Sequence, residues 1–231
     1  MLQSRTEVVA DYALQTQVAP RRVLARQPLQ ALETLGQQIT VRRGKEIYAE
    51  GALADHCYKI VSGSVRLVKL MADGHRQICE FLVAGDLLGF EDEDDRYFAA
   101  EAVSDCVLMR YSRRSVDTLI TEDNAFARHM RHLTAKGLEG AYKRMVLLCH
   151  KTAQERVAWF LLELSERTAN DNDCIQLPMT RGDIADYLGM VIETVSRTLT
   201  QLKESGVISM QSVNRIKLVD RDALEDARGD L

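Results

Sequence analysis

Residues 180–209 read TRGDIADYLGMVIETVSRTLTQLKESGVIS, and this stretch decides the fold of the carboxyl-terminal part of the chain. Thr180 and Asp183 have the spacing of a capping box, which predicts a helix from about Arg181. Gly189 suits the left-handed turn that ends such a helix, and a second helix is predicted directly after it. Two short helices joined by a tight turn form a helix-turn-helix.

The apolar residues of both predicted helices recur at helical spacing and define their inward faces. They are Ile184, Ala185 and Leu188 in the first helix and Ile192, Val195, Leu199 and Leu202 in the second. Glu193, Ser196 and Arg197 are then left on the outward face of the second helix. In the DNA major groove an arginine donates twice to guanine, a carboxylate accepts from cytosine, and a serine does either.

The same Glu193 and Arg197 could form an ordinary surface ion pair between residues i and i+4. Such a pair contributes only a few tenths of a kcal/mol to helix stability. Together with the turn glycine and the apolar frame, however, the outward side chains predict a helix that reads DNA bases. After it, residues 207–210 and 216–219 predict two strands of a wing, with Asn214 and Arg215 at its tip.

Composition limits what the rest of the chain does. Its 231 residues, 46% of them hydrophobic, suffice for one large or two modest domains. A net charge of -4 gives no overall attraction to nucleic acid, so phosphate contacts must come from local residues. The sequence has no stretch near the roughly 18 apolar residues of a membrane helix and no signal-peptide core, so we expect a cytosolic protein. Five scattered cysteines without a C-x-x-C pair predict reduced thiols and no metal site.

Glycines punctuate short strand-like runs from Ile39 to about Tyr111, which predicts an antiparallel sandwich or barrel. A long helix is predicted over residues 124–149. Its stripe of apolar and small residues comprises Phe126, Met130, Leu133, Gly137, Ala141, Met145 and Leu148. We expect part of this stripe to pack on the chain itself and part to meet a second copy. Thr152 and Glu155 predict a capping box for the next helix.

The chain is therefore expected to belong to the α+β class. We expect four parts: an N-terminal tail (1–28), a β-roll of sensor type (29–120), a dimerisation helix (121–150) and a winged helix-turn-helix (151–231).

Two segments resemble a known family of regulators. Residues 57–90, CYKIVSGSVRLVKLMADGHRQICEFLVAGDLLGF, resemble the β-roll of cyclic-nucleotide-binding domains. Residues 192–208, IETVSRTLTQLKESGVI, resemble the FixK branch of the Crp/Fnr transcription regulators, and the resemblance extends over the whole chain. It implies a homodimeric activator that binds palindromic double-stranded DNA, contacts RNA polymerase and controls genes of low-oxygen or related metabolism.

Particular residues take roles by this resemblance. Glu193, Ser196 and Arg197 occupy the E-x-x-S-R positions that contact a TTGAT-type half-site. The expected phosphate contacts are Thr180, Arg181, Thr194, Asn214 and Arg215. Family members usually carry Thr or Ser where this chain has Val191, so the reading helix is expected to lack a side-chain cap.

No cofactor is expected. A cyclic phosphate needs an arginine with a neighbouring hydroxyl, but the matched positions near Phe98 and Ala99 offer neither, and Arg96 lies earlier in the sequence behind an acidic run. An iron–sulfur cluster needs a group of thiolates, but no cysteine precedes Cys57.

Two alternatives involve the cysteines. Cys149 and His150 suggest an enzyme, but adjacent helical residues point about 100° apart and are poorly placed as nucleophile and base. The other alternative keeps DNA binding and adds control by oxidation of Cys149 or Cys174, against the simpler expectation of buried, inert thiols.

Overall fold

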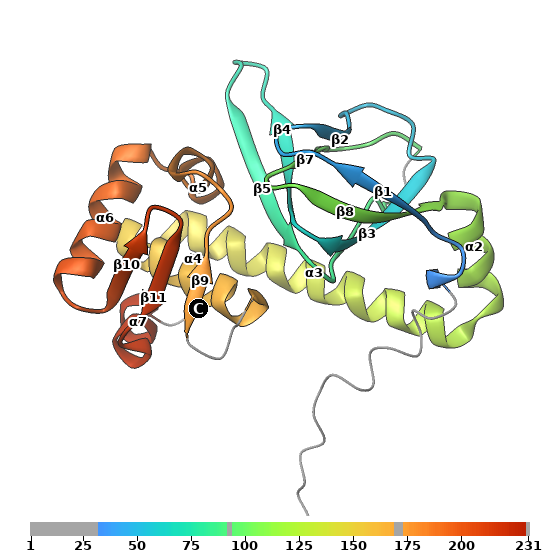
Figure 1. The fold of residues 1–231 in the computed structure, drawn as a ribbon. Helices are drawn as coiled ribbons and strands as arrows, with labels where there is room; N and C mark the ends of the chain where they lie inside the picture. The colour runs from blue at the N-terminus through green and yellow to red at the C-terminus, as the bar shows by residue number, and fades with distance from the viewer. Residues whose placement is uncertain (1–31, 92–93, 169–172, 230–231) are drawn as a thin grey trace, which may run out of the picture.

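The computed structural model describes residues 32–91, 94–168 and 173–229. A β-roll lies over one part of a long helix, and a smaller domain of helices with a three-stranded sheet lies at the far end of that helix (Figure 1). The mixed α+β class expected from the sequence is confirmed. The expected N-terminal tail, residues 1–28, lies outside the described residues.

The roll consists of two four-stranded antiparallel sheets with strand orders β1-β8-β3-β6 and β2-β7-β4-β5. The strands are β1 (Gln37–Val41), β2 (Glu46–Tyr48), β3 (His56–Ser62), β4 (Ser64–Leu70), β5 (Arg76–Val83), β6 (Leu87–Leu88), β7 (Ala99–Ala102) and β8 (Cys106–Ser112). Ile60, Val65 and Leu108 are fully buried between the sheets. Gly63 turns the chain from β3 into β4 with a φ of 93°, and a Cβ there would collide with the carbonyl oxygen of Asp105.

Two helices follow the roll, α2 (Arg113–Glu122) and the 27-residue α3 (Asn124–His150). The predicted stripe on α3 divides in two. Phe126 is fully buried against the roll, whereas Met145 is 57% exposed near the other end. Of all the residues of α3, Phe126 and Leu147 alone are buried, so most of the helix presents an uncovered surface.

The carboxyl-terminal domain contains α4 (Ala153–Thr168), β9 (Cys174–Gln176), α5 (Arg181–Leu188), α6 (Ile192–Glu204), β10 (Ile208–Ser212), β11 (Arg215–Leu218) and α7 (Arg221–Arg228). The predicted capping box of α4 is confirmed, because the Thr152 N–H donates to Glu155 Oε2 over 2.8 Å and the Glu155 N–H donates to Thr152 Oγ1 over 3.3 Å. The wing is β10 and β11, and β9 pairs with β11. Helix α7, which the sequence analysis did not predict, packs on α4 through the fully buried Leu224.

An aromatic cluster joins the roll to this domain. Phe81 of β5 lies 6.2 Å from Phe160 of α4 and 5.1 Å from Tyr187 of α5, measured between ring centroids. Phe160 and Tyr187 are themselves 5.8 Å apart. Aromatic pairs at such distances contribute about 0.5–1.5 kcal/mol beyond their buried area. Buried residues of both domains belong to one cluster, so the two domains share one apolar core.

Arg156 of α4 fixes the junction after α3. Its guanidinium donates to the Leu148 oxygen at the end of α3 over 3.0 Å and to the Leu188 oxygen at the end of α5 over 2.9 Å. The last carbonyl groups of a helix have no partner inside it. One side chain therefore caps both helices and holds their ends together. Within the described residues, no helix is both long and apolar enough to cross a lipid bilayer.

Candidate nucleic-acid interface

The helix-turn-helix begins with the predicted capping box. The Asp183 N–H donates to Thr180 Oγ1 over 3.1 Å, and the Thr180 N–H donates to Asp183 Oδ2 over 3.0 Å. Gly189 has a φ of 61° and ends α5 in the left-handed conformation. The local sequence thus sets the start and the end of α5 as predicted.

Helix α6 buries Val195, Leu199 and Leu202 as predicted, together with Thr198. The prediction for Ile192 is wrong, because this side chain is 45% exposed. Ile192 is the first residue of α6, where the helix protrudes beyond the core, and the preceding Val191 is 62% exposed. Val191 makes no side-chain cap hydrogen bond, as expected from its lack of a hydroxyl.

Glu193, Ser196 and Arg197 are all exposed on α6, and their spacing of three and four residues places them on one face. Arg197 donates a long, 3.4 Å hydrogen bond to the Thr194 hydroxyl. Among the described residues there is no salt bridge between Glu193 and Arg197, so the ordinary surface pair is not formed. A carboxylate, a hydroxyl and a guanidinium are left available to one ligand surface.

The expected phosphate contacts differ in accessibility. Asn214 and Arg215 are exposed at the wing, and the backbone of Asn214 is fixed by the Leu177 N–H, which donates to its carbonyl oxygen over 2.7 Å. Thr180 is exposed, although its hydroxyl serves as the cap of α5. Arg181 is half-buried, and burial lowers its pKa.

A cluster of ions, which the sequence analysis missed, attaches α5 to the roll. Asp183 is only 3% exposed, and its Oδ1 lies 2.8 Å from a guanidinium nitrogen of Arg66 on β4 and 2.8 Å from one of Arg76 on β5. Arg76 also pairs with Asp186 at 2.6 Å, and Arg66 pairs with Glu101 at 2.6 Å. The Asp183 carboxylate, which caps the first helix of the helix-turn-helix, therefore also attaches that helix to the roll.

The charge on Asp183 reflects a balance of opposing effects. Burial raises the pKa of this carboxyl group, but hydrogen bonds from Thr180 and the positive charges of Arg66 and Arg76 outweigh it. The net result is a pKa below its ordinary value of 3.8. The ion cluster is consequently charged, and stabilising, at neutral pH.

The candidate redox residues lie apart from the reading face. Cys149 is exposed at the end of α3. Cys174 is half-buried on β9, with its Sγ 3.9 Å from Gln211 Oε1. Burial raises the pKa of the Cys57 thiol to about 11, which leaves it a poor nucleophile.

Two domain models match the chain, a Crp-like helix-turn-helix domain over residues 155–227 and a cyclic nucleotide-binding domain over residues 38–123. Among curated proteins, the nitrogen fixation regulation protein FixK of Azorhizobium caulinodans is 43% identical over 201 residues, which cover 85% of this chain and 81% of that protein. The transcriptional activatory protein AadR of Rhodopseudomonas palustris is 34% identical over 76% of this chain and 75% of its own. The solved structure of FixK2 from Bradyrhizobium japonicum superposes with a TM-score of 0.82 at 39% identity, covering 85% of this chain and 98% of that one.

The chain belongs to the Crp/Fnr family, in its FixK branch. It is thus a transcription regulator with a helix-turn-helix DNA-binding domain, and its relatives are regulators rather than enzymes.

The roll of this FixK-like regulator matches a cyclic nucleotide-binding domain, but its buried arginine is not free to bind a cyclic phosphate. The Arg96 guanidinium lies inside the roll, where it pairs with Glu91 at 2.8 Å, donates to the carbonyl oxygen of His56 and stacks on Tyr48. Arg96 is only 2% exposed. The negative charge beside Arg96 already comes from Glu91, which a phosphate would have to displace.

We predict that Asp183→Asn makes the FixK-like regulator less stable by about 3 kcal/mol at pH 7, because Arg66 and Arg76 lose a buried counter-charge. Since the folded-state pKa of Asp183 is lowered, its contribution is complete above the ordinary value of 3.8 and is lost as the pH falls below it. The difference between wild type and variant should therefore narrow from pH 5 towards pH 3. Urea unfolding at several pH values measures this difference in the free energy of unfolding, with Asp117→Asn at an exposed position as control. A difference that does not change with pH would contradict the role of the Asp183 charge.

Proposed function

We propose that the protein binds a palindromic TTGAT-type site as a homodimer and activates transcription from it. The observation that carries this proposal is the outward face of α6, where Glu193, Ser196 and Arg197 are exposed and Glu193 and Arg197 form no ion pair with each other. The activator role is supported by the relatives, which include a transcriptional activatory protein and a nitrogen fixation regulator. An activator of this kind presents a surface to RNA polymerase, and we place the target genes in low-oxygen or related metabolism.

The chemistry of α6 suits the bases of that half-site. Arg197 suits the O6 and N7 atoms of guanine, and Glu193 suits the amino group of a cytosine on the opposite strand. Val191 and Ile192 add exposed apolar surface at the amino end of the same helix. Thymine carries a methyl group in the major groove that apolar side chains contact, so these two residues fit the thymines that open the half-site.

The uncovered face of α3 supports the homodimer. Its exposed residues follow the alternating spacing of four and three that coiled coils require, at Thr134, Leu138, Ala141, Met145 and Leu148. Leu138 and Met145 are 52% and 57% exposed, which leaves a seam of apolar side chains in water. A second copy on this seam generates a two-fold axis, and two-fold symmetry suits half-sites one helical turn apart.

We predict that Arg197→Ala weakens binding to the TTGAT palindrome by about 1–3 kcal/mol per half-site, since each protomer loses one bidentate base contact. Binding to a scrambled duplex should change much less. Fluorescence anisotropy with both duplexes measures the difference. Arg114→Ala removes the same charge from α2, at the opposite end of the roll from α6, and serves as control (Figure 1). Equal losses on the two duplexes would show that Arg197 does not read bases.

We predict that Leu138→Glu converts the dimer into a folded monomer, because two carboxylates would face each other across the seam of α3. Light scattering coupled to gel filtration gives the mass, and circular dichroism checks folding. The control is Val61→Glu, which introduces the same charge at a 48% exposed apolar position on β3. A variant that keeps the dimeric mass would place the interface elsewhere.

A second candidate function adds control by oxidation, and the exposure of Cys149 on α3 favours it. Cys149 lies one residue beyond Leu148, so an oxidised thiol would bring polar bulk beside the proposed seam. We expect peroxide to weaken binding of the palindrome in wild type and in Cys174→Ser, but not in Cys149→Ser. Protection by the Cys174 substitution instead would assign the control to β9, and unchanged binding in all three proteins would exclude oxidation as a signal.

A further inference from the structure

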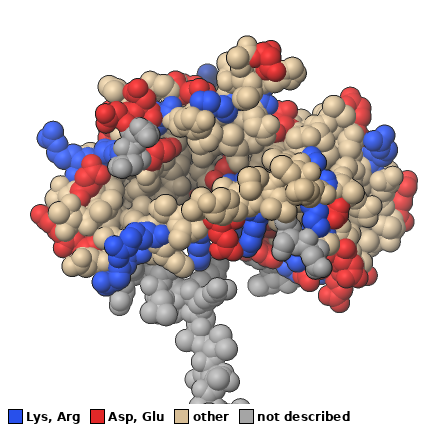
Figure 2. Space-filling model, turned by 180° about the vertical axis from the view of Figure 1, so that it is seen from behind, with Lys and Arg blue, Asp and Glu red and all other residues tan. Residues whose placement is uncertain are grey.

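The reading domain carries little net charge for a DNA-binding surface. On the described part of α6 and the wing, Arg197, Lys203, Arg215 and Lys217 are exposed without ion pairs, but so are Glu193 and Glu204. On the rear face of the molecule, acidic and basic side chains are intermixed rather than gathered into one basic patch (Figure 2). Because affinity for DNA depends strongly on the number of phosphates neutralised, further cations beside this domain would strengthen binding.

The turn between β1 and β2 supplies such cations. Arg42, Arg43 and Lys45 are all exposed there, and none of the three forms an ion pair with a described residue. Most other arginines of the roll are neutralised, as Arg66 is by Asp183 and Arg96 is by Glu91. We refer to Arg42, Arg43 and Lys45 as the basic turn.

The basic turn is held in place by backbone contacts. The Arg43 N–H donates to the Asp105 carboxylate over 2.8 Å, and the Gly44 N–H donates to the Ala102 oxygen over 2.7 Å. In return the Ala102 N–H donates to the Lys45 oxygen over 2.9 Å. Asp105, which accepts from the backbone of the turn, and the exposed Glu46 are acids of this region, so the three cations exceed them by one. The three cationic side chains therefore project from a fixed base.

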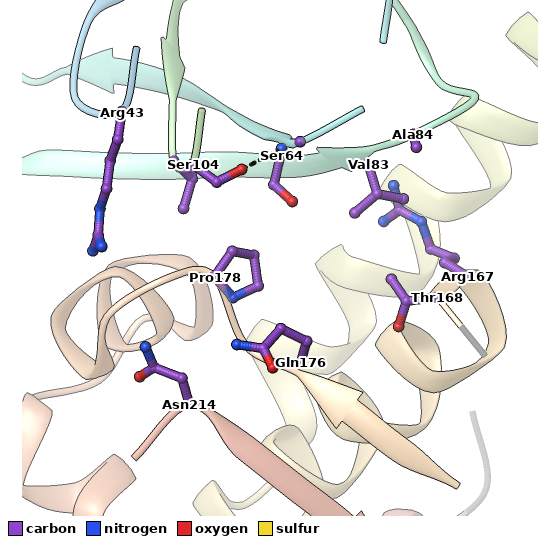
Figure 3. Close-up of a pocket in the computed structure, with 12 residues that line it drawn as sticks. Arg43, Ser64, Val83, Ala84, Ser104, Arg167, Thr168, Gln176, Pro178 and Asn214 are labelled. Atoms are coloured by element: carbon purple, nitrogen blue, oxygen red, sulfur yellow. Dashed lines mark hydrogen bonds between the residues drawn. The ribbon is translucent and has the colours of Figure 1, made fainter. Parts of the chain in front are cut away.

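The basic turn lies next to the wing. Arg43 lines a cavity of about 530 Å³ between the two domains, and the opposite wall includes Gln176, Pro178 and Asn214. Figure 3 shows the Arg43 side chain extending from the roll towards the wing, where Asn214 faces it. Arg43 of the basic turn and Asn214 at the wing tip thus lie on facing walls of one cavity.

We propose that the basic turn contacts DNA phosphates outside the half-site read by α6, on the side of the wing. The proposal rests on the DNA-binding function proposed above. Charge complementarity and the position of the basic turn beside the wing favour an extended polyanion over a small anion held in the cavity. Arg167, the other arginine of the cavity, is already neutralised by Asp86 and Glu163, and Arg42 and Lys45 lie outside the lining.

The test compares two duplexes with the same central palindrome. One ends at the outer edges of the half-sites, and the other extends about 10 base pairs, one helical turn, beyond each edge. Wild type should bind the extended duplex more tightly and with a steeper dependence on salt. Arg42→Gln/Arg43→Gln should remove this advantage, with an affinity loss of roughly tenfold or more on the extended duplex and a salt slope reduced by roughly 3 to 4 for the four arginines of a dimer. Adding Lys45→Gln should reduce both further.

The matched control is Arg114→Gln/Arg128→Gln, which removes two exposed, unpaired cations at the other end of the roll. It should bind both duplexes as wild type does, and thermal melting checks that all variants fold. If wild type binds the short palindrome specifically but gains nothing from the extension, the basic turn is not a phosphate contact, whereas failure on the short palindrome would refute DNA reading itself. Equal losses of the basic-turn variant on both duplexes also overturn the proposal. A third outcome also overturns the proposal: inorganic phosphate at constant ionic strength weakens DNA binding by wild type but not by the basic-turn variant. That result would assign the cavity to a small anion.

Discussion

The position of the helix-turn-helix on the roll depends on one buried carboxylate. Asp183 completes the capping box of α5 and at the same time binds Arg66 and Arg76 of the roll. A buried charge is costly unless it is paired and hydrogen-bonded, and this one is both. Because its ion pairs are also hydrogen bonds with fixed geometry, the ion cluster sets the orientation of α5 on the roll. The adjacent aromatic cluster of Phe81, Phe160 and Tyr187 alone would not set it. Loss of the carboxylate would affect helix capping and domain attachment together.

The roll has the architecture of a cyclic nucleotide-binding domain, while the charge of its buried Arg96 is paired internally. Glu91 supplies to Arg96 the negative charge that a phosphate would otherwise bring, and Tyr48 covers the guanidinium. In this molecule β4 and β5 of the roll supply the partners of α5.

Sequence alone predicted the features that depend on neighbours within a few residues. Thr180, Asp183 and Gly189 fix the ends of α5 through contacts over three to five residues, which can be read from spacing. The partners of Asp183 are 107 and 117 residues away, and no local pattern indicates them. Ile192 was misplaced because helical spacing gives the direction of a side chain but not whether anything lies opposite it. Arg96 was judged only by its place in the motif, since its partner Glu91 is one of several acids in a row. Helix α7 was missed because Leu224 is its one buried apolar residue.

Because Arg156 caps both helices, it fixes the position of α5 relative to the end of α3. Only Lys151 and Thr152 separate α3 from α4, and the Arg156 guanidinium links the ends of α3 and α5. In a symmetric pair, the distance between the two recognition helices would then be set by how the long helices cross. Inserting one base pair at the centre of an operator shifts its arms by about 3.4 Å and rotates them by about 35°. A dimer held rigid by this link would not follow that rotation, so it would bind operators with altered spacers weakly even when both arms keep their sequence.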